Sequence, residues 1–339
     1  MLHIFMTAVN AVFPIVLLIL NGYLLRQKNI IGEDFVKKGN ALVFKICLPA
    51  LFFVNIYDIR ELADLPWNTI VYCALGVVAL FLLGFVVAVV TTQDDRRRGV
   101  LCQCCFRSNF NIIGISLAAQ LGGEAAAAVS AVIATLVVPA FNIFAVIALS
   151  VFLKGEGGKR PSFKSMLLDI VKIPLILAAV AGVSCLAIRA LQQKLLGSVV
   201  FALDRELKFV YSALGMLKAL ATPLALVVLG GQFKFSVVKG MFREIAVGTG
   251  FRLIAAPVLT IGVALLLERV GLVSCDPITM PAMLTLFGSP VAVTSAVMAA
   301  QMHNDEQLAA QLVVWSSIGS VVTIFAGVCL LMACGLIAV

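Results

Sequence analysis

Residues 106–114 read FRSNFNIIG, and residues 286–295 read LFGSPVAVTS. Each stretch lies near the middle of a long apolar segment. Proline removes a backbone donor, and Gly, Asn and Ser can satisfy the backbone groups that an interrupted helix leaves free. The sequence therefore predicts two broken helices, with breaks near residues 108–111 and 288–291.

An internal repeat with one offset of 181 residues relates the two stretches. The identical positions are Phe106, Ser108, Ala118, Ala119 and Gln120 in the first copy and Phe287, Ser289, Ala299, Ala300 and Gln301 in the second. Further matches occur in the same order: Pro14 and Gly22 correspond to Pro174 and Gly182, and Lys45 and Pro49 resemble Lys218 and Pro223. Such self-similarity indicates a duplicated structural unit.

The composition is that of a membrane protein. Of 339 residues, 62% are hydrophobic and 12% charged, whereas a soluble domain carries about 25% charged residues. A membrane-spanning helix needs about 20 apolar residues. Candidate segments run over residues 4–25, 35–57, 67–91, 98–122, 125–152, 166–190, 208–232, 243–267, 277–302 and 308–337. We therefore predict an all-α membrane protein with ten transmembrane helices in the lipid bilayer. The net charge of +8 lies mostly in loops and does not indicate a nucleic-acid partner.

An odd number of spans in each repeat determines how the two halves are oriented. After five crossings the second copy starts from the opposite face, so the halves are inverted, as in secondary transporters. We predict the first five-helix repeat over residues 1–153, a cytoplasmic linker over 154–165 and the second repeat over 166–339. The broken helices are then helices 4 and 9.

Lys and Arg residues near the segment ends indicate the cytoplasmic side. One side collects Arg26, Lys28, Lys37, Lys38, Arg96, Arg97, Arg98, Lys154, Lys159, Arg160, Lys164, Lys234, Lys239 and Arg243. The other side collects Arg60, Arg189, Lys194, Arg205, Lys208 and Arg269. We expect the first side to face the cytoplasm from the plasma membrane, with both chain termini outside the cytoplasm.

The two predicted breaks would place helix ends at the middle of the bilayer. The N-terminal ends of the second half-helices direct free N–H groups at the centre and, with nearby cations, favour an anion. The candidate substrate-binding residues are Arg107, Ser108, Asn109, Asn111, Arg252, Gly288, Ser289, Pro290 and Lys45. Carboxylates are scarce within the segments, so an organic anion would supply the missing countercharge.

Some of these residues also have a structural interpretation. Arg107 would then bind carbonyl groups at the break, and Lys45 and Lys218 would extend to the membrane surface. The cysteine cluster at residues 102–105 is either a soft-metal site or, as we prefer, a set of small packed side chains. We expect no metal site and no cofactor.

These features predict a secondary carrier that moves a small organic anion, such as a dicarboxylate or an aromatic carboxylate, by alternating access. Sodium-coupled symport is the alternative, although hard cations prefer carboxylate oxygens, which helices 4 and 9 lack at depth. A membrane sensor without transport activity is a further interpretation. No motif of an enzyme is found, so we expect no catalytic residues. The coupling ion, Na⁺ or H⁺, and a homodimeric assembly are left open.

Several stretches resemble the auxin efflux carrier family. They are LPALF at 48–52, PLALVVLGG at 223–231 and AAQMHNDEQLA at 299–309, together with the two broken segments. The resemblance covers nearly the whole chain and is closest to short prokaryotic members. This chain has Asn109-Phe-Asn111 where plant carriers show an Asn-Pro motif, so ligand preference does not transfer.

The resemblance implies the fold of bile acid–sodium symporters. That fold has a scaffold from helices 1, 2, 6 and 7 and a transport core from helices 3–5 and 8–10. It also implies that the substrate carboxylate, for example that of an auxin-like acid, lies where helices 4 and 9 cross. Asn109, Asn111 and Pro290 match the family's crossover residues by position.

Overall fold

The structure, a computed structural model, describes residues 2–58, 67–153 and 174–337. Within these ranges the chain is helical, and the only β feature is one isolated bridge. The predicted all-α class is therefore confirmed. The predicted linker over 154–165 and the first residues of the sixth predicted segment, 166–173, lie outside the described ranges.

Helix is present in each of the ten predicted segments. The first half of the chain contains α1 (Leu2–Gln27), α2 (Glu33–Leu42), the π-helical turn η1 (Val43–Cys47), α3 (Leu48–Tyr57), α4 (Trp67–Thr91), α5 (Asp95–Phe106), the π-helical turn η2 (Phe110–Gly114) and α6 (Ile115–Val151). The second half contains α8 (Pro174–Leu196), α9 (Leu203–Glu206), α10 (Lys208–Gln232), the 3-10 helix η3 (Phe235–Met241), α11 (Phe242–Gly250), the π-helical turn η4 (Phe251–Ala255), α12 (Ala256–Glu268), α13 (Thr279–Gly288), α14 (Thr294–Gln301) and α15 (Glu306–Ala333).

Among the described residues, 6 helical stretches are long and apolar enough to cross a membrane. The prediction of ten membrane-spanning helices in two inverted repeats therefore stays a prediction. The boundary that we predicted between the fourth and fifth segments falls inside α6. There Gly122 and Gly123 leave the helical conformation, and Gly123 has φ 69°, which glycine adopts without strain.

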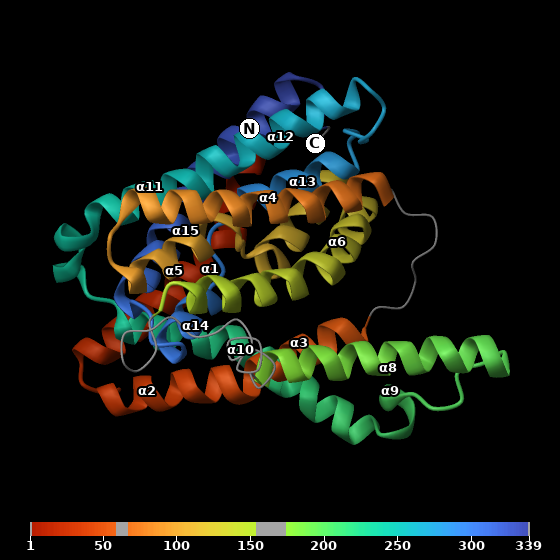
Figure 1. The fold of residues 1–339 in the computed structure, drawn as a ribbon, viewed down its shortest axis with the longest axis horizontal. Coiled ribbons are helices and arrows are strands. Elements are labelled where there is room, and N and C mark those ends of the chain that lie inside the picture. Colours follow the sequence, from red (N-terminus) through yellow and green to blue (C-terminus); the bar gives the residue numbers. More distant parts are fainter. Residues whose placement is uncertain (1, 59–66, 154–173, 338–339) are drawn as a thin grey trace.

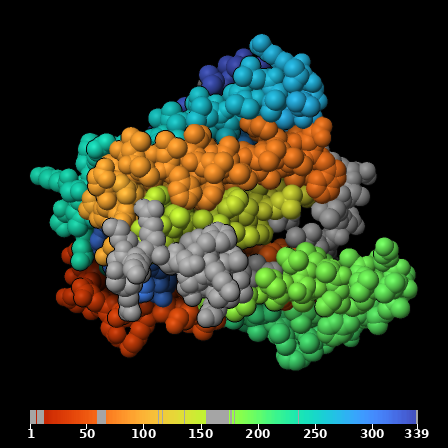
Figure 2. Space-filling view, in the orientation of Figure 1, coloured from red at the N-terminus to blue at the C-terminus, as the bar shows by residue number. Residues whose placement is uncertain are grey.

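The helices form two layers, which are separated vertically in Figure 1. The lower layer contains α2, α3, α8, α9 and α10, and the upper layer contains α4, α5, α6, α11, α12, α13 and α15. Helices α1 and α14 connect the layers, since each packs against α10 below and against α15 above. In the space-filling view, α8 and the start of α10 (green) stand away from the orange and cyan helices of the upper layer (Figure 2).

Many large apolar side chains point away from the protein. On α4, for example, Leu75, Val86 and Val90 are 62%, 60% and 70% exposed. Leaving such surface in water is unfavourable by about 25 cal/mol for each Å². A hydrocarbon environment removes this penalty, so the outer side of α4 has the character of a lipid-facing surface.

Glycines allow close helix contacts in the lower layer. A Cβ atom at Gly22 of α1 would overlap the backbone of Val227 in α10, and one at Gly230 would overlap the backbone of Ile19. Gly182 of α8 lies in the same way against α3, where a Cβ atom would be 3.0 Å from Cβ of Ile56. Small residues at these contacts let the helix backbones approach, which is how membrane helices commonly pack.

Candidate functional site

Both predicted breaks are present, and they lie against each other. Residues 107–109 separate α5 from η2, and residues 289–293 separate α13 from α14. The two interruptions run in opposite directions where they meet, and Ser108 and Val291 form an isolated antiparallel bridge. We call this meeting point the crossing.

Two backbone hydrogen bonds hold the crossing together. The amide of Asn109 donates to the carbonyl of Pro290 at 2.8 Å, and the amide of Ala292 donates to the carbonyl of Arg107 at 3.2 Å. Asn109 and Pro290 are the pair that the offset of 181 matches in the sequence. Proline has no N–H, so it cannot return the bond that it accepts.

Arg107 lies at this point and is only 2% exposed. Its Nη2 donates to Oδ1 of Asn142 on α6 at 2.7 Å, and its Nη1 contacts Sδ of Met298 on α14. Within the described part of the chain, no carboxylate lies within ion-pair distance of this guanidinium. A buried cation with only an amide oxygen and a thioether beside it is expensive to maintain.

Arg252 on η4 is also buried, but carbonyl groups surround it. It donates to Ser289 at 3.0 Å, Cys105 at 3.2 Å, Leu286 at 3.1 Å and Phe287 at 2.5 Å. These carbonyls belong to the C-terminal ends of α5 and α13 or directly follow them, where the helix leaves its last acceptors free. Arg252 therefore neutralises the negative ends of both first half-helices.

Several buried polar atoms around the crossing have no hydrogen-bond partner. They include Oγ of Ser108, Nδ2 of Asn109 and Oγ of Ser295 on α14. These three residues are buried, and each unpaired polar atom is unfavourable by about 1–3 kcal/mol. Asn111, by contrast, is partly exposed. The crossing thus combines a buried cation with donor groups that have nothing to bind.

Two other predicted residues have structural contacts at the crossing. The hydroxyl of Ser289 donates to the carbonyl of Thr285 at 2.5 Å, one turn earlier in α13. Gly288 is the last residue of α13, and a side chain there would meet only Leu284. Both residues therefore shape the backbone at the second break.

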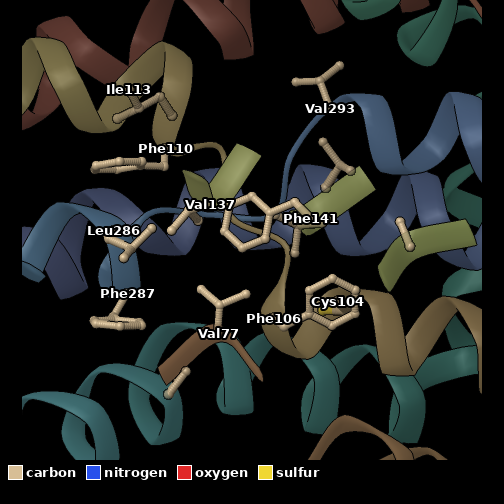
Figure 3. Packing of buried hydrophobic residues seen from close by; sticks show 14 of the residues in the cluster. Val77, Cys104, Phe106, Phe110, Ile113, Val137, Phe141, Leu286, Phe287 and Val293 are labelled. Atoms are coloured by element: carbon tan, nitrogen blue, oxygen red, sulfur yellow. The ribbon is translucent and has the colours of Figure 1, made fainter. Parts of the chain in front are cut away.

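Apolar side chains surround the crossing (Figure 3). Phe106 and Phe110 flank the first break, and Phe287 and Val293 flank the second. All four are buried in one hydrophobic cluster that also contains Phe141 of α6. These side chains exclude water from the backbone contacts, which strengthens electrostatic interactions at the centre.

Comparison with known proteins places the chain in a family. A profile for membrane transport proteins, the auxin efflux carriers, matches residues 7–326. The chain belongs to this family. It is similar to an uncharacterized transporter of Methanothermobacter thermautotrophicus, with 23% identity over 330 residues that cover 95% of this chain and 97% of the relative. An uncharacterized transporter of Methanocaldococcus jannaschii is 24% identical over 278 residues, which cover 79% of this chain and 82% of the relative.

Membership of the auxin efflux carrier family confirms the resemblance found in the sequence and makes the chain a multi-pass membrane protein of a transporter family.

Two of the cations considered from the sequence lie outside the crossing. Lys45 is exposed on η1, a turn that packs against α10 and α14. Lys218 on α10 lies 3.5 Å from the carboxylate of Asp58, which also accepts a hydrogen bond from Tyr211. Lys218 therefore has a countercharge within the lower layer.

The sequence reasoning missed the partners of Arg107. Asn142 is a lone amide within the apolar segment 125–152, and that isolation was a usable signal. Met298 gave no signal, because methionine is common in membrane helices. Ser295 lies in the second predicted stretch but was not predicted to bind the substrate, although its hydroxyl is among the unpaired groups.

Proposed function

We propose that this protein is a secondary carrier of a small organic anion, a dicarboxylate or an auxin-like acid, which it moves by alternating access. The observation that carries the proposal is the charge balance at the crossing. Arg252 has four carbonyl acceptors, whereas Arg107 has one amide oxygen and a sulfur.

The half-helices that end and begin at the crossing determine its charge balance. Two half-helices end at the crossing with free carbonyls, and the guanidinium of Arg252 compensates those negative ends. Two further half-helices, η2 with α6 and α14, begin there with free N–H groups. The N–H groups of Val291 and Ala292 bond neutral oxygens of Ser316 and Arg107, and within the described residues no carboxylate pairs with the Arg107 guanidinium. The positive charge at the crossing thus has no countercharge there, so a bound anion would lower its electrostatic energy.

The unpaired donors support a carboxylate in particular. A carboxylate accepts several hydrogen bonds at once, and Arg offers it two parallel donors. Asn109 and Ser108 add neutral donors on the same break. Asn111, which is partly exposed, would contact the ligand from the open side.

We also propose that the chain folds as ten membrane helices in two inverted repeats. The glycine contacts support this arrangement. Gly22 and Gly182 correspond in the sequence, and they lie against α10 and α3 respectively. The offset that relates Pro49 to Pro223 also relates Ile56 to Gly230, so the α1–α10 contact has its counterpart in the α8–α3 contact.

In this proposal the lower layer with α1 is the scaffold and the upper layer with α14 is the transport core. The Lys- and Arg-rich loops would face the cytoplasm from the plasma membrane, leaving both termini outside. Movement of the core against the scaffold would carry the crossing from one side to the other.

Uptake by proteoliposomes tests the proposed function. A carrier of this kind should give saturable uptake of at least one member of a panel of radiolabelled dicarboxylates and aromatic carboxylates. Because an anion is moved, a potential that is positive inside should raise the uptake rate. Protein-free liposomes are the control. Replacing sodium with choline should leave uptake unchanged, and a strict sodium requirement would favour symport instead. Absence of uptake for every anion in the panel, with folded protein, would contradict the proposal.

A further inference from the structure

A cavity of about 590 Å³ lies away from the crossing. Its lining residues come from both layers and include Arg26, Lys37, Asn40, Lys234, Ala300 and Gln307. One wall is formed by the end of α1, by α2 and by the end of α10, and the opposite wall by the end of α14 and the start of α15. The cavity therefore lies on the side of the molecule that carries most Lys and Arg residues.

The charges in this cavity do not cancel. Arg26 pairs with Glu33 at 2.9 Å. Lys37 and Lys234 have no carboxylate within ion-pair distance in the described part of the chain. Glu306 is in the first turn of α15, where the helix end already attracts a negative charge. Arg26, Lys37 and Lys234 against Glu33 and Glu306 leave the cavity lining with one net positive charge.

The cavity also contains polar atoms without partners. Asn40 is 2% exposed, and its Oδ1 has no hydrogen-bond partner. Oε1 of Gln307 on the opposite wall also has no hydrogen-bond partner. Polar cavities of this size hold water or a polar ligand, because unsatisfied buried groups are unfavourable. Both unpaired atoms are oxygens that accept hydrogen bonds, so they favour bound water, and the attraction for small anions comes from the lysines.

Helix α14 connects this cavity to the crossing. Its first residue, Thr294, follows the second break, and its last residue, Gln301, lines the cavity. At 1.5 Å per residue, the eight residues of α14 span about 12 Å. An anion in the cavity is thus about two turns of one helix from the positive end of α14, and Arg107 contacts Met298 on the same helix between these two points.

We propose that this cavity is an antechamber in which Lys37 and Lys234 concentrate small soluble oxyanions before they reach the crossing. The proposal rests on the proposed function, since it assigns the antechamber to the same transported anion. It adds a second binding region with its own residues. Lys37 and Lys234 act there as exposed cations that attract the anion without holding it tightly.

Thiol chemistry tests the charge of the cavity without knowledge of the substrate. Ala300 lines the cavity, so the variant Ala300→Cys places a thiol there. The modification rate is measured with a negatively charged methanethiosulfonate (the ethylsulfonate) and with a positively charged one (the ethyltrimethylammonium). Each rate is divided by that of the same reagent with free mercaptoethanol. Protein without the new cysteine gives the background of the native thiols.

The normalised rate of the negative reagent should exceed that of the positive reagent on the order of tenfold, because a charged cleft enriches counter-ions. Adding Lys37→Gln and Lys234→Gln should remove most of this preference. Lys38→Gln is the matched control, because Lys38 neighbours Lys37 but pairs with Asp34 at 2.7 Å. An unreactive thiol, or a preference that the double variant leaves intact, would overturn the antechamber.

Two further experiments distinguish a soluble anion from a lipid headgroup, and the antechamber from the crossing. The experiment is run in phosphatidylcholine and again with added phosphatidylglycerol. An unchanged preference supports a soluble anion, and a preference lost with the anionic lipid would assign the cavity to a lipid headgroup and overturn the proposal. Arg107→Ala should leave the preference intact, so loss of anion uptake and loss of the antechamber are measured separately.

Discussion

The first break carries Arg107, Ser108 and Asn109, whereas residues 289–293 of the second break are Ser-Pro-Val-Ala-Val. The two breaks share their backbone arrangement, since Asn109 and Pro290 meet across the crossing. They differ in chemistry. The first break supplies a cation and neutral donors, and the second supplies carbonyls, a proline and apolar side chains. A duplicated frame can therefore be symmetric in its backbone and asymmetric in its recognition groups.

The two buried arginines also differ in their chemical surroundings. Arg252 ties together the carbonyl ends of both first half-helices, so its role is structural. Arg107 has only neutral neighbours, and in the proposed function it binds the transported anion. Substitutions of these two residues should thus differ in kind, one affecting the fold and the other affecting transport.

The largest effect is expected for Arg252→Met. This change leaves carbonyls of both half-helix ends without a donor, at about 1–3 kcal/mol for each unpaired group. The free energy of unfolding should fall by about 3 kcal/mol or more, seen as a lower melting temperature in detergent and a loss of monodisperse protein. Arg243→Met is the control, because Arg243 also donates to a carbonyl, that of Val90, but is exposed. Equal stability of the two variants would contradict a structural role for Arg252.

Arg107→Ala should reduce anion uptake by about a hundredfold, because the ligand loses its only buried cationic partner on the first break. The folded protein should keep a melting temperature near that of the wild type, since removal of an uncompensated buried charge relieves a penalty. Uptake into proteoliposomes and the melting temperature are measured on the same preparation. Normal uptake would contradict a role of Arg107 in transport. Unfolding comparable to that of Arg252→Met would show that both arginines are structural.

The smallest effect is expected at the second break. Pro290→Ala restores an N–H group and allows the interruption to shorten toward a helix. The maximal uptake rate should fall about threefold, while KM stays within experimental error, because no recognition group is changed. Pro139→Ala, within α6, is the control for removing a proline from a helix. A change in KM for Pro290→Ala would mean that the second break also recognises the ligand.

The sequence was sufficient to locate both breaks. Gly288 and Pro290 remove helix stability locally, and the polar run at 107–111 is unusual at that depth. Asn109 and Pro290, which are bonded across the crossing, are also separated by the offset of 181. Helix-breaking residues act on their neighbours in the chain, and an internal repeat is visible in the sequence itself. Both features can therefore be recognised without knowledge of the fold.

Long-range pairing could not be predicted in this way. Arg252 was selected as a ligand residue, but its carbonyl partners lie far along the chain in α5 and α13. Likewise Lys218 pairs with Asp58, which directly follows α3. The direction of a long side chain depends on which helices pack together, and no local pattern encodes that. Lys45 is exposed, as in the alternative in which its side chain extends to the membrane surface.

A binding measurement on Arg107 is the most direct test of the anion site. Wild-type protein and the Arg107→Ala variant, both purified in detergent, are heated with the panel of dicarboxylates and aromatic carboxylates and with the uncharged amides of the same compounds. We expect at least one carboxylate to raise the melting temperature of the wild type and to leave that of the variant unchanged, while its amide affects neither. An equal rise in both proteins, or an equal rise with the amide, would contradict an anion site at the crossing.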